Sequence, residues 1–298
     1  MNYTISNSRL TVEISDRGGE LRSIQDETGK EYLWQGDKKV WEDRAPNLFP
    51  YIGRMTEKSY RFQGKTYHMD IHGFLPTSDM ELESKTDDCL TLKLKASEET
   101  LEKYPFLFEL EITWKLCRNK LEITYQVKNK DKKTMYFGIG GHPGFIVPVE
   151  ETKRFEDYCI DFGEESHPRR VAMSEDCFVL EGDEPLELLE GRYLKLRHDL
   201  FDYDAVILKD IPETVRLGCA EGKKEVVVSF PQMTYLGIWH RPFQTPEYVC
   251  IEPWSSLPSR KGVKEDIAKQ PGLVSLESGD VYRNTWSITI EEKQNKNK

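Results

Sequence analysis

The sequence lacks apolar runs of the length that membranes require. Its first fifteen residues, MNYTISNSRLTVEIS, contain no stretch of signal-peptide length. No segment approaches the roughly 20 consecutive apolar residues of a membrane helix. We therefore expect a cytoplasmic protein that does not bind membranes.

Basic residues are also fewer than acidic ones. The chain has 42 Lys and Arg residues against 52 Asp and Glu residues, which gives a formal net charge of -10. Nucleic-acid binding depends on clustered Lys and Arg that neutralise phosphates. This balance argues against a nucleic-acid partner.

Paired cysteines are missing as well. No two of the six cysteines have the short spacing of a metal site, and a protein of the cytoplasm keeps its thiols reduced. We expect free thiols and no bound metal, with Cys117 and Cys250 buried because both lie in apolar, strand-like runs. The six are Cys89, Cys117, Cys159, Cys177, Cys219 and Cys250.

Helical periodicity and linkers are scarce, whereas period-two alternation is abundant. In FLFELEITWKL every even position from Phe106 to Leu116 is apolar, and the alternation resumes from Leu121 to Val127 after Arg118, Asn119 and Lys120. Two amphipathic segments joined by so short a polar stretch predict a β-hairpin. Further strands are expected at Tyr193–Arg197, Ala205–Lys209, Val215–Ala220, Glu225–Phe230, Tyr235–Trp239, Tyr248–Ile251 and Asn284–Glu291.

Only two short helices are expected, at Ser97–Tyr104 and Gly262–Lys269. Strands continue past the middle of the chain without a Pro-, Gly- or Ser-rich linker. The pattern predicts an all-β protein with residues 1–298 in one domain, built as a large antiparallel β-sandwich. About the last six residues, in the tail EEKQNKNK, are expected to fray.

Four segments combine a titratable residue with Gly, Pro or aromatic neighbours. They are APNLFPYIGRM with Arg54, MDIHGFLP with His72, GIGGHPGFIVP with His142, and YVCIEPWSSLP with Glu252. Considered alone, Arg54 could be an ordinary surface residue, and each histidine could be a structural residue in a turn. Glu252 is harder to dismiss, because a carboxylate after a buried strand is costly unless it is paired or hydrated.

Taken together, and in this order, the four segments resemble the aldose 1-epimerase (galactose mutarotase) family. The residues of these segments are most similar to those of the mutarotase-like proteins associated with bacterial lactose operons. The segments that carry the resemblance are LTVEISDRGGELRSI, NLFPYIGR, HGF, GGHPGF, FDYDAVILKD and IEPW. They extend over nearly the whole chain.

The resemblance implies a supersandwich of two large antiparallel sheets with an open cleft on a concave face. It implies interconversion of the α and β anomers of a free hexose, with no cofactor and no metal. Glu252 would be the general base at the anomeric hydroxyl, and His142 the general acid at the ring oxygen. The glycines around His142 would let the sugar approach the backbone.

Other residues would bind the sugar by the same resemblance. Arg54 and His72 would contact its hydroxyls and ring oxygen. The family's sugar-binding Asp corresponds to Asp202 or Asp204, which a strand would direct to the same side. Trp239 and Trp254 are candidates for stacking on the sugar.

One departure concerns the identity of the sugar. Galactose mutarotases proper have an Asn-Arg pair where this chain has Gly53-Arg54. Alternatives are a mutarotase for hexose 6-phosphates, which would need a further cation such as Lys58 or Arg241, and a non-catalytic sugar-binding module. A glycoside hydrolase or lyase fits less well, since hydrolases use two carboxylates and only Glu252 stands out. The sequence is compatible with a monomer or a dimer.

Overall fold

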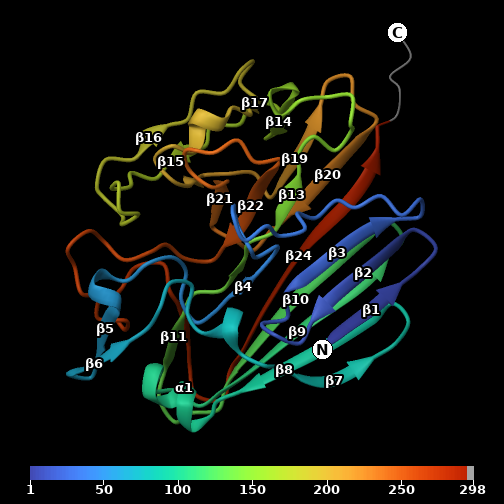
Figure 1. Ribbon diagram of the computed structural model, residues 1–298. Coiled ribbons are helices and arrows are strands. Elements are labelled where there is room, and N and C mark those ends of the chain that lie inside the picture. The colour runs from blue at the N-terminus through green and yellow to red at the C-terminus, as the bar shows by residue number, and fades with distance from the viewer. Residues whose placement is uncertain (294–298) are drawn as a thin grey trace.

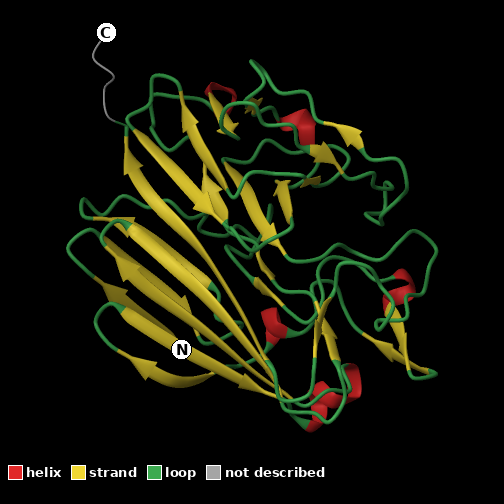
Figure 2. Ribbon diagram, turned by 180° about the vertical axis from the view of Figure 1, so that it is seen from behind, coloured by secondary structure: helices red, strands yellow, loops and turns green. Residues whose placement is uncertain are grey.

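The computed structural model describes residues 1–293 and is dominated by antiparallel strands (Figures 1 and 2). The largest sheet has nine strands, with the long strands β9, β10 and β24 at its centre. Its order is β17 (Tyr193–Lys195), β14 (Tyr158–Asp161), β19 (Thr214–Cys219), β20 (Lys224–Ser229), β24 (Val281–Glu292), β10 (Lys120–Asn129), β9 (Phe108–Cys117), β8 (Cys89–Lys95) and β7 (Glu81–Lys85). The expected fraying of the tail concerns residues that lie almost entirely outside this range.

A second sheet of eight strands carries Trp239, Glu252 and Trp254. Its order is β16 (Glu184–Pro185), β15 (Arg169–Arg170), β18 (Val206–Lys209), β21 (Tyr235–Trp239), β22 (Tyr248–Trp254), β12 (Gly140–Gly141) and β4 (Asn47–Leu48), with β13 (Gly144–Ile146) also paired to β22. Figure 2 shows the long strands of the nine-stranded sheet on one side of the molecule and most of the loops on the other.

Smaller sheets complete the fold. They are β1 (Asn2–Ser6), β2 (Leu10–Ser15) and β3 (Leu21–Asp26); β5 (Ser59–Phe62) and β6 (Lys65–His68); and β11 (Met135–Phe137) and β23 (Val274–Leu276). Four 3-10 turns are η1 (Thr56–Lys58), η2 (Leu75–Thr77), η3 (Phe155–Asp157) and η4 (His198–Phe201). None of the helices among the described residues is long and apolar enough to cross a membrane.

The period-two alternation predicted the hairpin correctly. In β9 the even positions Phe108 to Leu116 are buried, and β9 pairs with β10 across the turn at Arg118 and Asn119. Side chains from both large sheets, such as Leu110 and Ile251, join a single apolar cluster. Burial of apolar side chains on one face of each sheet is what holds the two sheets together.

Three local predictions had different outcomes. The helix α1 (Glu98–Lys103) forms behind its Ser97 cap, whose hydroxyl accepts from the Thr100 N–H. No helix forms at 262–269, where turns follow one another instead. Cys117 is exposed rather than buried, because it follows Leu116 and therefore points to the opposite face of β9.

Candidate active site

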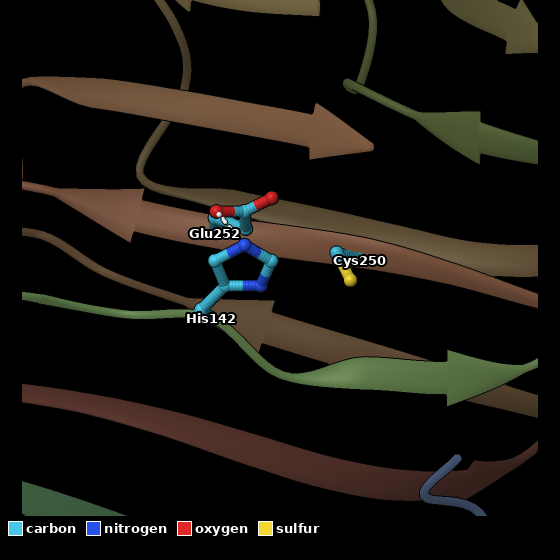
Figure 3. Close-up of side chains that lie close together, drawn as sticks. All are labelled: His142, Cys250 and Glu252. Carbon is cyan, nitrogen blue, oxygen red and sulfur yellow. Dashed lines mark ion pairs between the residues drawn. The ribbon is translucent and has the colours of Figure 1, made fainter. Parts of the chain in front are cut away.

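His142 and Glu252 meet because of a single strand register. β12 pairs Gly140 with Trp254, and β13 pairs Gly144 with Cys250. Both pairings belong to the same antiparallel register, which places residue 142 opposite residue 252. Figure 3 shows the His142 ring and the Glu252 carboxylate pointing toward one another.

The two side chains are in contact and almost inaccessible. His142 Nε2 lies 3.1 Å from Glu252 Oε2, and the residues are 8% and 1% exposed. The contact is not aligned as a hydrogen bond: among residues 1–293, Glu252 Oε2 and His142 Nδ1 are buried without hydrogen-bond partners. Buried polar atoms normally have partners, so these two unpartnered atoms mark the contact as a candidate for chemistry.

Burial opposes a charge on either group. It lowers the pKa of His142 well below 6.5, and it raises the pKa of Glu252 well above 4.5, with the nearby Asp204 carboxylate adding to the second effect. A neutral Glu252 beside a neutral His142 holds as many protons as a carboxylate beside an imidazolium. The pair therefore keeps one acid and one base in either arrangement.

Aromatic rings surround the imidazole of His142. The ring centroids of Trp41, Trp239 and His72 lie 5.1, 5.6 and 5.6 Å from it. Trp41 and Trp239 contact each other edge to face at 5.5 Å. This packing fixes the orientation of the imidazole and explains its low exposure.

His72 is fixed by the neighbouring Gly53. The backbone N–H of Gly53 donates to the ring Nδ1 of His72 at 3.2 Å. The backbone N–H of His72 donates to the Gly53 carbonyl at 3.1 Å. A neutral ring that accepts at Nδ1 carries its proton on Nε2. Burial, reinforced by the Arg54 charge, lowers the pKa of His72 to about 4, so this ring is a neutral donor at physiological pH.

These residues line one cleft of about 450 Å³. Arg54, His72, His142, Asp204, Trp239, Glu252 and Trp254 all contribute to its wall. The volume lies within the usual range of roughly 300–1,000 Å³ for small-molecule sites. The residues that the sequence singled out are thus brought together, with one exception.

Asp202 is that exception. The expectation that a strand directs Asp202 and Asp204 to the same side is wrong, because β18 begins only at Val206. Asp202 closes the turn η4, and Asp204 follows with a left-handed backbone (φ 70°). Asp204 lines the cleft, whereas Asp202 lies outside it.

The glycines around His142 make room for protein, not for a ligand. A Cβ atom on Gly144 would lie 2.8 Å from the ring of Trp41, and one on Gly141 would lie 2.5 Å from the ring of Trp286. Side chains at these positions would displace tryptophans that pack against the strand. The sequence-based explanation of these glycines was wrong.

Several cleft residues escaped the sequence analysis. Trp41, Cys177 and Phe243 line the cleft from loops outside the segments that carry the resemblance, whereas Tyr203 lies within FDYDAVILKD and Arg241 was considered only as a cation for a phosphate. Of the first three, only Trp41 had a usable signal, since it lies six residues before the NLFPYIGR segment. The others come close through tertiary structure alone.

His198 and His240 form a second pair behind the cleft wall. His198 Nδ1 and His240 Nε2 are 3.0 Å apart, and His198 stacks on Phe155 at 4.1 Å. His240 follows Trp239 and is fully buried. His198 is partly buried.

Cys250 adds a third potential ligand to the pair at the cleft. Its sulfur and ligand atoms of His142 and Glu252 lie within 4.8 Å of one another (Figure 3). Burial, reinforced by the Glu252 charge, raises the pKa of the Cys250 thiol well above 9. The thiol is therefore protonated in the metal-free protein, and a metal bound here would have to displace its proton.

Comparisons with known proteins identify the family of the chain. The family model for aldose 1-epimerase matches residues 1–288. The chain belongs to the aldose 1-epimerase family. Over 298 residues it is 30% identical to protein LacX (chromosomal) of Lactococcus lactis subsp. lactis, a match that covers 97% of this chain and 99% of that protein.

Solved structures of this family have the same fold. A galactose mutarotase related enzyme from Lactobacillus acidophilus superposes with a TM-score of 0.94 at 34% identity, covering 99% of each chain. A galactose mutarotase-like protein from Lactobacillus casei superposes with a TM-score of 0.92 at 31% identity, covering 98% of this chain and all of the other. The expected family and all-β fold are therefore confirmed.

Proposed function

We propose that the protein is a mutarotase that interconverts the α and β anomers of a free hexose without a cofactor or metal. The observation that carries the proposal is the buried contact between His142 and Glu252 at the wall of a sugar-sized cleft. Anomerisation needs an acid and a base on one sugar ring, and this pair holds one of each.

Ring opening would begin at the anomeric hydroxyl. The Glu252 carboxylate accepts the hydroxyl proton, the C1–O1 bond becomes a carbonyl, and the C1–O5 bond breaks. His142, which carries the shared proton at this stage, donates it to O5. A sugar bound against the two groups would add hydroxyl donors to Glu252 and so favour its carboxylate form. A positioned acid or base typically contributes about 10²–10⁴-fold to the rate.

Reclosure would reverse these roles. After rotation about the C1–C2 bond, His142 takes the proton back from the O5 hydroxyl as O5 attacks the other face of C1. Protonated Glu252 returns its proton to O1. The pair ends in its starting state, so no other proton donor or acceptor is required.

The neighbouring residues would bind and orient the sugar. His72 offers its Nε2–H to the ring oxygen or a hydroxyl. Arg54 offers donors that stabilise negative charge developing on oxygen. Asp204 accepts hydrogen bonds from hydroxyls, and Trp239 presents an aromatic surface to the apolar face of the sugar.

The cleft supports a free hexose better than a phosphorylated one. Among the described lining residues, the basic side chains are those of Arg54 and Arg241. The carboxyl groups are those of Asp43, Asp204 and Glu252. Lys58, the other cation considered for a phosphate, lies outside the cleft and pairs with Asp70 at 3.1 Å. A cleft whose cations do not outnumber its carboxyl groups offers little attraction to a phosphate dianion.

Polarimetry tests the proposal. Freshly dissolved α-D-glucose and α-D-galactose should reach their unchanged equilibrium rotation faster with the protein than without it. Glucose 6-phosphate should show a smaller acceleration. Acceleration with glucose 6-phosphate alone would replace the free sugar by a phosphorylated one, and no acceleration with any of the three would contradict the proposed activity.

A further inference from the structure

Cys177 and Asp204 face each other at the cleft from two different loops. Cys177 lies between β15 and β16, and Asp204 lies between η4 and β18. The Cys177 thiol donates to Asp204 Oδ2 at 2.6 Å. Both residues line the cleft that contains His142 and Glu252.

The backbone at both positions is unusual. Cys177 and Asp204 have φ angles of 66° and 70°, in the left-handed region that residues other than glycine adopt at a cost. Each closes a turn, since the Cys177 N–H donates to Ser174 and the Asp204 N–H donates to Phe201. Strained conformations of this kind persist where the surrounding structure fixes them, and they concentrate at functional sites.

Both oxygens of the Asp204 carboxylate are held. Oδ1 accepts from the Ala205 N–H at 2.9 Å, and Oδ2 accepts from the Cys177 thiol. An ionised carboxylate has about four acceptor positions, so these two bonds leave others for hydroxyl donors. The arrangement restricts rotation of the carboxylate without using up its capacity.

The thiol is suited to remain a donor. Burial, followed by the hydrogen bond to Asp204, raises the pKa of Cys177 to about 12, and the Arg54 charge opposes only part of this shift. The sulfur therefore keeps its proton at neutral pH. A thiolate would repel the carboxylate instead of holding it.

From this geometry we propose that Cys177 is a positioning residue, which orients the Asp204 carboxylate to accept hydrogen bonds from sugar hydroxyls. The inference rests on the proposed sugar-binding function of the cleft. It assigns a role to a residue that would not itself take part in proton transfer.

Sugar affinity gives the first test. Trp41, Trp239 and Trp254 line the cleft, so hexose binding can be followed by tryptophan fluorescence whether or not turnover occurs. Cys177→Ala should raise Kd and KM about three- to tenfold, the loss expected for one hydrogen bond, and leave kcat within about twofold. Cys177→Ser, which keeps a donor, should restore affinity to within about twofold of the wild type.

A double-mutant cycle separates positioning from general damage to the fold. Cys177→Ala should weaken sugar binding in the wild type but cause little further loss in an Asp204→Asn background. Equal losses in both backgrounds, or an unchanged Kd for Cys177→Ala, would overturn the proposal. Binding with the expected pattern but no turnover would instead contradict only the mutarotase activity, and absence of sugar binding by the wild type would overturn both.

Thiol alkylation tests the contact without any sugar. Iodoacetamide labelling at pH 8 is followed for each cysteine by peptide mass spectrometry, with the exposed Cys117 as the internal reference. Asp204→Asn should speed alkylation of Cys177 about fivefold relative to Cys117, because removing the negative charge increases the thiolate fraction. An unchanged ratio would show that Asp204 does not hold the thiol and would overturn the proposal.

Discussion

His142 Nε2 and Glu252 Oε2 lie 3.1 Å apart, although the two residues are 110 positions apart in the chain. The register of β12 and β13 against β22 makes this approach unavoidable. Two buried titratable groups this close titrate as a unit, and the consequences extend to the pH profile, the packing and the chemistry of the site.

The pH profile of kcat/KM should reflect the shifted pKa values of this pair. Acid inactivation requires a proton on His142 while Glu252 is already protonated. Because burial lowers the pKa of His142, the acid limb should lie below pH 6.5. Because burial raises the pKa of Glu252, the proton that the pair shares should leave well above pH 4.5, and its loss should produce the alkaline limb. An acid limb at or above pH 6.5 would contradict this account.

Trp41 should be needed for activity, although it carries no titratable group. Its ring packs against the imidazole of His142, so Trp41→Ala should lower kcat about tenfold or more by freeing that ring. Tyr67 stacks on Tyr60 with ring centroids 5.5 Å apart and does not line the cleft, so Tyr67→Ala is the matched control. Comparable losses of kcat in the two variants would assign Trp41 a general packing role.

Chelators should leave the activity unchanged. In the proposed mechanism, proton transfer between Glu252, His142 and the sugar balances without a metal. Polarimetry before and after extended dialysis against EDTA measures this. A loss of activity that added Zn²⁺ reverses would require a metal at His142, Cys250 and Glu252.

His240 should make the fold sensitive to acid. Burial lowers its pKa from the usual 6.5 to about 4, so between these pH values the unfolded chain binds a proton that the native state does not bind. The free energy of unfolding should therefore be highest above pH 6.5 and should fall as the pH approaches 4. His240 alone should account for about 3 kcal/mol of this fall. Urea denaturation at several pH values should show a shallower dependence for His240→Gln.

The control for that measurement is His68→Gln, which alters an exposed histidine on β6. It should reproduce the pH dependence of the wild type. A His240→Gln variant with the full wild-type pH dependence would show that other groups cause the acid sensitivity.

The sequence predicted those parts of the protein that depend on local pattern. Alternation revealed β9 and β10, and the segments around Arg54, His72, His142 and Glu252 pointed to a common site. The assumption that a strand holds Asp202 and Asp204 failed, because a turn that ends in the left-handed residue Asp204 lies there. In this turn Asp204 enters the cleft and Asp202 does not.

Contacts between distant loops could not be predicted. Cys177 lies 27 residues from Asp204, and no periodicity or motif connects them. The glycines beside His142 misled for the same reason, because the tryptophans they accommodate come from elsewhere in the chain. Such relationships depend on the tertiary packing of segments that have no regular structure of their own.

The exchange rate between the α and β anomers at equilibrium, measured by magnetisation-transfer NMR with the protein present, tests the central claim most directly. His142→Gln and Glu252→Gln should each lower the catalysed rate about 10²-fold or more while the circular dichroism spectrum stays that of the wild type. His68→Gln should retain the wild-type rate. Near-normal exchange in either site variant, with the fold intact, would contradict the proposal that His142 and Glu252 are the acid and the base.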